Sequence, residues 1–251
     1  MHEENMTKNN IHCCGIKLSV INAFKNLKSK IQEKNEERRN QWDKAFFFRL
    51  ASERLSNRGR ILDLGCGRGY FLQISDDNAF GIDGNIKNLK EAQEHCTKVV
   101  QGDILELPFS EATFDGIHCS HVIEHFDPHS AYELLYEMNR VLKVGGILII
   151  SSPLLWSGFF RDFTHVKPYY PESIMHYYGE HRIQLTKDNL DCFYEIQEIK
   201  WRYNKVPLRP ILLPKGSIIN TLLLLFVEWL NKVGFGKYER SAYTMVLQKL
   251  R

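Results

Sequence analysis

The middle of the chain, from about residue 58 to residue 152, alternates short apolar runs with patterns typical of helices. Apolar residues recur at spacings of three and four over 130–142, which predicts a helix that Asp127-Pro128 begins and Gly145-Gly146 ends. Strands that alternate with helices at this spacing predict a parallel, doubly wound α/β sheet with right-handed crossovers. Five apolar runs supply the predicted strands, at residues 60–64, 79–83, 98–101, 114–119 and 146–151.

The chain on either side of this region has a looser pattern. Helical spacing over about 16–55 predicts amphipathic helices that cap a core, with contact to a membrane surface or a nucleic acid as the alternative. After the fifth strand we expect a long loop over 153–171, a helix over 171–178 and late strands over 193–201 and 242–248. The late strands would complete a mostly parallel seven-stranded sheet.

An insertion at about 204–240 separates the two late strands and contains a strongly apolar segment, 218–230. Three polar residues interrupt this segment, and it is shorter than the roughly 18 to 20 apolar residues that a membrane span needs. Three interpretations stay open: a buried cap over an acceptor pocket, a homodimer surface, or a helix that dips into a membrane or binds a lipidic acceptor. In the last case, lysines would flank the helix at headgroup level (Lys215, Lys232 and Lys237).

The composition narrows the class of protein without identifying a partner. Of the 251 residues, 43% are hydrophobic and 25% are charged, which excludes disordered, collagenous and coiled-coil proteins. The net charge of +3 requires no polyanion, so we expect no DNA partner, and RNA is disfavoured. Six scattered cysteines without CxxC spacing indicate reduced thiols, and the polar N-terminus has no secretory signal. We therefore expect a cytoplasmic protein, with a location peripheral to a membrane as the alternative.

The strongest chemical signal is a glycine-rich turn, Asp-Leu-Gly-Cys-Gly-Arg-Gly at 63–69, which follows the first predicted strand and precedes a predicted helix. Glycines let the backbone turn tightly and let a ligand lie against bare main chain. The second strand ends in Asp83, where a carboxylate can accept hydrogen bonds from both hydroxyls of a ribose. The third strand is followed by Asp103, where a carboxylate can accept the exocyclic amine of adenine, although a plain turn residue is the alternative.

This set of segments resembles the class I S-adenosylmethionine-dependent methyltransferases. The matching segments are 61–69, Gly81-Ile82-Asp83, Gly102-Asp103-Ile104, 114–117 and 142–146. The one departure is Val144, where the family often has proline. The resemblance implies a Rossmann-like fold and a methyltransferase domain over 57–251, after an N-terminal tail and helical cap over 1–56. Within that domain, 58–152 would bind the cofactor and 153–251 would face the acceptor.

The resemblance also implies S-adenosyl-L-methionine as the cofactor. Its binding residues would be Asp63, Gly65, Cys66, Gly67, Gly69, Asp83, Gly84, Asp103, Ile104, Cys119 and Ser120. The glycine-rich loop would line the methionine end of the cofactor, and Asp63 would reach its ammonium group. Asp83 would hold the ribose, and Asp103 would bind adenine. An NAD site is the alternative for such a loop. The G-x-G-x-x-G pattern of an NAD site would need its third glycine one residue later than Gly69. An NAD site would also give Asp103 no role.

A histidine-rich segment follows the fourth predicted strand. His121, Glu124 and His125 have the H-x-x-E-H spacing of inverted zinc proteases, but the next helix begins too soon for that type of site. Two interpretations remain: a Glu-His pair that packs the loop over the cofactor, or a divalent-metal site. The second resembles small-RNA 3′-terminal ribose methyltransferases, with His165 as the distant ligand. Because His121 replaces the first glutamate of that pattern, we assign no metal.

His165 lies in a segment, 161–169, that resembles an acceptor-side loop common in bacterial methyltransferases, some of them attached to glycan pathways. Methyl transfer from a sulfonium uses an activated donor, so positioning supplies most of the acceleration. A hydroxyl or amine acceptor must still lose a proton, and a histidine that titrates near neutrality suits that task. We predict His165 first and His125 second as the general base, with hydrogen-bonded loop histidines as the alternative.

The resemblance thus implies an enzyme that methylates an acceptor, with oxygen as the expected nucleophile. The acceptor would be a small molecule, a glycan or a lipid-linked compound. The first alternative is a regulatory or scaffold protein that binds the cofactor without turnover. The second is a metal-dependent RNA ribose methyltransferase.

Overall fold

A computed structural model describes residues 44–178, 192–206, 208, 218–232 and 236–251. Lys44–Arg251 forms one compact unit, and the helices predicted over 16–43 lie outside the described residues. The compact unit begins before the domain boundary that the sequence suggested at residue 57, because it includes a helix, α2 (Lys44–Leu55).

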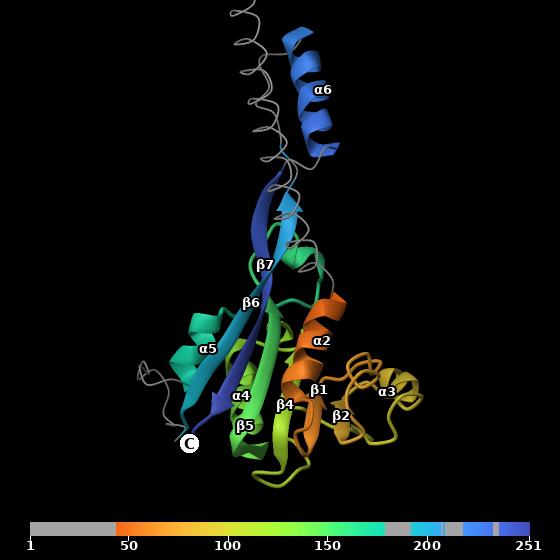
Figure 1. Cartoon of the computed structure of the whole chain (residues 1–251), viewed down its shortest axis with the longest axis vertical. Coiled ribbons are helices and arrows are strands. Elements are labelled where there is room, and N and C mark those ends of the chain that lie inside the picture. Colours follow the sequence, from red (N-terminus) through yellow and green to blue (C-terminus); the bar gives the residue numbers. More distant parts are fainter. Residues whose placement is uncertain (1–43, 179–191, 207, 209–217, 233–235) are drawn as a thin grey trace, which may run out of the picture. The chain divides into compact units, whose positions relative to one another are not determined.

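Seven strands form one sheet in the order β3-β2-β1-β4-β5-β7-β6. The first five are parallel, whereas β7 runs antiparallel to both β5 and β6. The predicted mostly parallel, seven-stranded sheet is therefore confirmed (Figure 1). The strands are β1 (Ile61–Leu64), β2 (Ala79–Asp83), β3 (Val99–Gln101), β4 (Phe114–Ser120), β5 (Leu142–Pro153), β6 (Tyr194–Val206) and β7 (Lys237–Lys249).

The predicted helix over 130–142 forms as α4 (Pro128–Val141). Asp127 caps it, because its Oδ1 accepts hydrogen bonds from the backbone N–H groups of His129 and Ser130, and Pro128 fits the first turn. The predicted helix over 171–178 forms as α5 (Pro171–Tyr178). The other helical elements are α3 (Ile86–Ala92), α6 (Ile218–Lys232) and two 3₁₀ turns, η1 (Ile123–His125) and η2 (Phe159–Arg161).

The helix expected directly after the glycine-rich turn is wrong. Residues 65–75 form successive turns, with a single α-type hydrogen bond from Gln73 N to Gly69 O and a tighter one from Ile74 N to Phe71 O. Gly69 has φ +79°, a left-handed conformation that interrupts a right-handed helix. The fifth strand also begins earlier than predicted, at Leu142, because that residue already pairs with Phe114 of β4.

Helices cover both faces of the sheet, and alternate residues of β1 take part in both cores. Leu62 and Leu64 are fully buried in the cluster that contains the apolar stripe of α4. Ile61 faces the other cluster, together with Ala51 and Leu55 of α2. The sequence suggested that α2 belongs to a helical cap. In the structure, α2 packs on the sheet and forms part of the core.

The two late strands extend further than the sequence suggested. β6 and β7 pair along their whole length, from Tyr194↔Lys249 to Val206↔Lys237, whereas β5 pairs with β7 only as far as Pro153↔Ala242. The ends of β6 and β7 therefore form a two-stranded ribbon beyond β5, and α6 lies between these strands in the chain. Among the described residues, no helix combines the length and the apolar character needed to cross a membrane.

Candidate functional site

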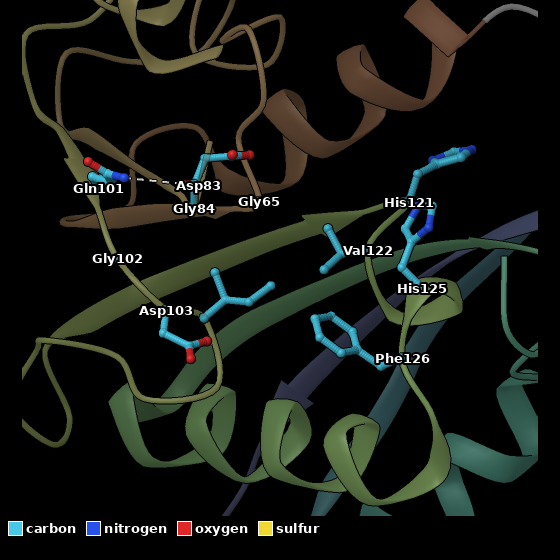
Figure 2. Close-up of a pocket in the computed structure, with 11 residues that line it drawn as sticks. Gly65, Asp83, Gly84, Gln101, Gly102, Asp103, His121, Val122, His125 and Phe126 are labelled. Atoms are coloured by element: carbon cyan, nitrogen blue, oxygen red, sulfur yellow. Dashed lines mark hydrogen bonds between the residues drawn. The ribbon is translucent and has the colours of Figure 1, made fainter. Parts of the chain in front are cut away.

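A cleft of about 690 Å³ lies at the carboxyl ends of the parallel strands (Figure 2). This is the edge where doubly wound sheets bind their ligands. The last residues of β2 and β3 and the turns after β1, β2, β3 and β4 line the cleft, so segments far apart in the sequence share one wall. The lining residues are Gly65, Asp83, Gly84, Gln101, Gly102, Asp103, Ile104, His121, Val122, His125 and Phe126.

The glycine-rich turn is held against β2 by its own backbone. Gly65 N and Cys66 N both donate to Ile82 O, at 2.9 Å and 3.0 Å. Gly65 has φ +70°, and a Cβ added there would lie 2.5 Å from Cγ2 of Val122. A larger residue would therefore be strained and would press on the cleft wall. Only glycine leaves the main chain bare at this point, which fits a ligand that approaches the backbone closely.

Asp83 joins the glycine-rich turn to the start of α3. Its Oδ2 accepts a hydrogen bond from Gly67 N at 2.9 Å, and its Oδ1 accepts one from Asn85 N at 2.7 Å. Each carboxylate oxygen can accept more than one hydrogen bond. Asp83 therefore orients the loop and still presents acceptor capacity to the cleft, where sugar hydroxyls are suitable donors.

Asp103 also lines the cleft and lies below Asp83 in the view of Figure 2. Its Oδ1 accepts a hydrogen bond from Leu105 N at 2.9 Å, so it is a turn residue as well as a lining residue. The chain that follows is tied to α4, because Glu137 accepts from Leu107 N at 2.7 Å and Arg140 donates to Phe109 O at 2.7 Å. This bracing fixes the wall that carries Asp103.

A second hollow of about 300 Å³ adjoins the cleft and shares Gly65 and His121 with it. Asp63 lies here with only 3% of its surface exposed, and its Oδ1 is 2.7 Å from Nδ1 of His118. The His118 ring stacks on Phe71 at a centroid distance of 4.0 Å. The carboxylate expected to meet an ammonium group is thus already held by a buried imidazole.

The predicted cofactor residues separate into three groups. Gly65, Asp83, Gly84, Asp103 and Ile104 line the cleft, and Asp63, Gly65, Cys66, Gly67 and Ser120 line the second hollow. Gly69 and Cys119 line neither. A Cβ on Gly69 would lie 3.0 Å from Cα of Ala92, so this glycine permits close packing against α3.

Both predicted cysteines are buried thiols. Burial, reinforced by the nearby carboxylates, raises the pKa of Cys66 and the pKa of Cys119 far above the ordinary value for a thiol. Both therefore stay protonated at neutral pH, which argues against a nucleophilic role.

His121 lines the cleft in an uncommon backbone conformation. It follows β4 directly and has φ +57°, and its N–H donates to Ser151 O at 2.8 Å. Non-glycine residues rarely adopt this left-handed region, and when they do the surrounding structure must hold them there. The turn places Val122, His125 and Phe126 on the cleft wall.

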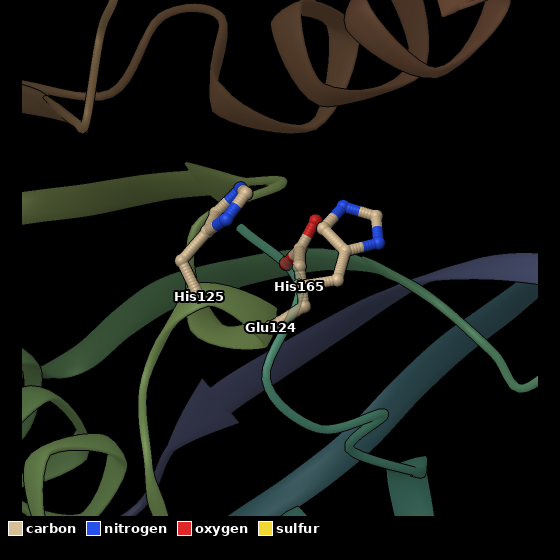
Figure 3. Close-up of side chains that lie close together, drawn as sticks. All are labelled: Glu124, His125 and His165. Atoms are coloured by element: carbon tan, nitrogen blue, oxygen red, sulfur yellow. The ribbon is translucent and has the colours of Figure 1, made fainter. Parts of the chain in front are cut away.

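Glu124, His125 and His165 come together from two segments that are far apart in the sequence (Figure 3). The backbone makes this contact: Val166 N donates to Glu124 O at 2.8 Å, and Lys167 N donates to the same oxygen at 3.3 Å. The two imidazole rings have a centroid distance of 5.1 Å. His125 lines the cleft, whereas His165 is not among the lining residues.

The hydrogen bonds of the two histidines define their neutral tautomers. Nδ1 of His125 lies 3.1 Å from Thr164 O, and Nδ1 of His165 lies 2.8 Å from Phe159 O. A carbonyl oxygen can only accept, so Nδ1 carries the proton in each neutral ring. Nε2 of each ring is then the atom that can accept a proton. Each imidazole can therefore act as a base through its Nε2 atom.

The same three side chains supply ligand types that a divalent metal uses. One ligand atom from each of Glu124, His125 and His165 lies within 4.8 Å of the other two. Two ligands of one zinc ion lie at most roughly 4.2 Å apart, since each is roughly 2.1 Å from the metal. The cluster could therefore hold an ion after a small contraction.

Three residues of the site were missed by sequence reasoning. His118 is the partner of Asp63 in the β1–β4 register, and a polar residue inside an otherwise buried strand is the signal that could have indicated it. Gln101 ends β3 and donates through Nε2 to Gly84 O at 3.2 Å. Phe126 lines the cleft, and its carbonyl oxygen accepts a hydrogen bond from the Tyr169 hydroxyl at 3.2 Å.

Comparison with known proteins agrees with this geometry. Residues 62–150 match the family model for a methyltransferase domain. A crystal structure of an S-adenosylmethionine-dependent methyltransferase from Archaeoglobus fulgidus is 26% identical in sequence, with a TM-score of 0.53 over 80% of this chain and 94% of that chain. Residues 62–150 therefore match a methyltransferase domain in sequence, and the sheet around the cleft has the fold of a class I methyltransferase.

Two curated relatives match part of the chain. An uncharacterised protein of Methanocaldococcus jannaschii is 35% identical over 108 residues, which cover 41% of this chain and 46% of the relative. A malonyl-[acyl-carrier protein] O-methyltransferase of Herminiimonas arsenicoxydans is 34% identical over 97 residues, which cover 37% of this chain and 36% of the relative. The match spans less than half the length of either relative.

Proposed function

We propose that this chain transfers a methyl group from S-adenosyl-L-methionine to a hydroxyl of a small-molecule, glycan or lipid-linked acceptor, because residues 62–150 match the family model for a methyltransferase domain. One observation carries the proposal: the same cleft is lined by Asp83 and Asp103 at one end and by His125 at the other. Groups suited to a nucleoside and a group suited to deprotonation therefore face a common space. We propose the same division of the chain, with 58–152 for the cofactor and 153–251 for the acceptor.

The chemistry of the cleft fits the cofactor. Asp83 would accept hydrogen bonds from the ribose hydroxyls, and Asp103 with the backbone of Ile104 would bind the adenine edge. The bare backbone of Gly65, Gly67 and their neighbours would accommodate the methionine portion, with Asp63 and Ser120 in the adjoining hollow. S-adenosylmethionine supplies a methyl group on a sulfonium, which needs no further activation. The residues of this chain have to bind, align and desolvate the reactants.

Proton transfer from the acceptor is the chemical task left to the protein. An attacking hydroxyl has to lose its proton, and His125 is the predicted base that lines the cleft. Its Nδ1–H group is held by Thr164 O, which leaves Nε2 as the proton acceptor. The ring of His165 would pack against the ring of His125 and hold it in place. The His165 ring also contacts Phe159. This reverses the order in which the sequence ranked the two histidines.

The function is tested by separating binding from turnover. The wild-type chain and His125→Asn are titrated with S-adenosylhomocysteine by calorimetry. Both are then incubated with S-adenosylmethionine carrying a radioactive methyl group and with lipid and glycan extracts of the source cells. Asparagine can keep the hydrogen bond to Thr164 O but cannot accept a proton. We expect equal binding and a loss of methyl transfer of about 100-fold or more in the variant.

The outcomes separate the alternatives. A folded chain that does not bind S-adenosylhomocysteine would overturn the proposal. Binding without methyl transfer to any extract by the wild type would favour the regulatory or scaffold alternative. Loss of transfer on addition of a chelator, with binding retained, would assign Glu124, His125 and His165 to a metal instead of to base catalysis. A cytoplasmic location remains an expectation that fractionation of the source cells can check.

A further inference from the structure

Helix α6 presents an apolar face to the outside of the molecule. Leu222, Leu225, Phe226 and Trp229 are between 55% and 63% exposed. Their spacing of three, four and seven residues places them on one face of the helix. Between Thr221 and Lys232, where the side chains are described, no residue is buried. We call these four residues the α6 apolar face.

The α6 apolar face is continuous and ordered along the helix. The rings of Phe226 and Trp229 are nearly parallel, with centroids 6.0 Å apart and an interplanar angle of 23°. Glu228 and Lys232 border this face and form an ion pair, with Nζ of Lys232 3.4 Å from Glu228 Oε1. An exposed apolar face of this kind is typical of a surface that contacts another protein or a membrane.

The helix is fastened to the ribbon made by β6 and β7. The side chain of Asn231 accepts a hydrogen bond from Leu208 N at 2.9 Å and donates one to Leu208 O at 3.1 Å. Lys205 Nζ, near the end of β6, donates to Asn231 O at 2.9 Å. The carboxyl end of α6 is therefore held by one hydrogen bond to the ribbon and by two to Leu208, which follows β6.

The charges around this end of α6 favour an anionic surface. Basic residues outnumber acidic ones on the described parts of the ribbon and the helix, with Lys205, Lys232, Lys237 and Arg240 against Glu228 and Glu239. Trp229 lies one turn from the helix end, where an amphipathic indole suits the boundary between headgroups and acyl chains. Basic residues beside an apolar helix are typical of segments that lie in a membrane interface.

The length of α6 decides between lying in a membrane and crossing it. The helix has 15 residues, which at roughly 1.5 Å per residue is about 22 Å. The hydrocarbon core of a bilayer is about 30 Å thick. A helix of this length is too short to cross the core, so it is suited to an orientation parallel to the surface, with the α6 apolar face towards the lipid.

We propose that the α6 apolar face docks on an anionic lipid surface. Its four apolar side chains would enter the boundary between headgroups and acyl chains, while the lysines and Arg240 contact lipid phosphates. This proposal stands apart from methyl transfer, because it requires neither cofactor nor acceptor. It would hold the methyltransferase domain where lipid-linked acceptors are found.

The test is flotation of the full chain with vesicles of two compositions: phosphatidylcholine alone, and equal parts of phosphatidylcholine and phosphatidylglycerol. The variant is the triple substitution Leu225→Ser, Phe226→Ser and Trp229→Ser. The matched control replaces three apolar residues exposed on other parts of the compact unit, namely Ile74→Ser, Val144→Ser and Ile196→Ser. Thermal unfolding confirms that all three proteins are folded.

We expect the wild type and the control to float with the anionic vesicles. The α6 variant should have a vesicle partition coefficient at least about tenfold lower. Equal partitioning of the variant and the wild type would overturn the proposal, and so would failure of the wild type to float. Equal flotation with both lipid compositions would overturn the anionic assignment. Self-association of the wild type that the variant abolishes, without flotation, would assign the face to a second copy of the chain.

Discussion

Two apolar runs of this chain look alike in sequence and have opposite environments. Ile147–Ile150 in β5 is between 0% and 4% exposed, whereas Leu224, Leu225 and Phe226 in α6 are between 46% and 58% exposed. β5 is enclosed by β4 and β7 and covered by helices on both faces. The described residues of α6 have no such enclosure. Hydrophobicity therefore predicts that a run forms an element, but its neighbours decide whether the run stabilises the fold or contacts a partner.

The largest effect on stability is expected when a side chain of the enclosed run in β5 is truncated. Ile149→Ala removes a fully buried side chain from the centre of β5 and leaves a cavity beside α2. We expect the free energy of unfolding to fall by about 3 kcal/mol, measured by urea denaturation. A loss of less than about 1 kcal/mol would show that the core relaxes around β5, and the contrast with α6 would then weaken.

Cofactor affinity should depend on the enclosed sheet, where Asp83 ends β2, and not on α6. Asp83→Ala removes the carboxylate that accepts from Gly67 N and Asn85 N. It also removes the predicted acceptor for the ribose. We expect binding of S-adenosylhomocysteine to weaken about 100-fold by calorimetry. Glu228→Ala, which removes a carboxylate from α6, is the matched control and should bind as the wild type does. Equal weakening in both variants would contradict the separation of the two regions.

The bracing of the cleft wall should make stability depend on pH. Burial opposes ionisation of Glu137, but hydrogen bonds from Arg140 and Leu107 N outweigh it and lower the pKa of its carboxyl below the ordinary 4.5. The resulting stabilisation is complete above the pKa of the unfolded chain and is lost as the pH falls through the lower folded-state pKa.

Glu137→Gln tests this dependence. We expect a loss of about 2 kcal/mol in the free energy of unfolding at neutral pH, and a smaller difference from the wild type in acid. Urea denaturation at several pH values measures both quantities. Glu133→Gln, an exposed glutamate of the same helix, is the control and should change little. A difference that does not shrink in acid would assign the effect to packing instead of charge.

The smallest effect is expected from the exposed run. Leu225→Ala removes a side chain that is 58% exposed, so the free energy of unfolding should change by less than about 0.5 kcal/mol. The substitution is chemically comparable to Ile149→Ala, which makes the two variants a matched pair for denaturation. A loss above about 1 kcal/mol would mean that the α6 apolar face is covered within the chain.

Much of the cofactor side could be predicted because its signals are local. The turn at 63–69, the acid that ends β2 and the acid after β3 each follow a short apolar run, and parallel strands bring their carboxyl ends to one edge. The same logic failed for the helix after the turn, because the left-handed conformation of Gly69 was not visible in the sequence. The role of His118 was also missed, since it depends on a partner in another strand.

The surroundings of His125 and His165 were predicted less completely because their contacts are long-range. His125 and His165 were candidates by residue type, but their order depended on which ring reaches the cleft. That is decided by hydrogen bonds from 166–167 to Glu124 O and by the fit of Tyr169 against Phe126. Loop residues of this kind carry no periodic signal, so the sequence alone could not show which of the two rings lines the cleft.

The sequence by itself determined the order of the strands along the chain, the position of the glycine-rich turn and the acids that follow it. These features arise from residues adjacent in the chain, where propensity, capping and periodicity act. Only the tertiary structure decided which histidine lines the cleft, that α2 belongs to the core, and that the apolar run of α6 stays exposed. Those outcomes depend on contacts between segments many residues apart, and burial is a property of the neighbours that a residue acquires on folding.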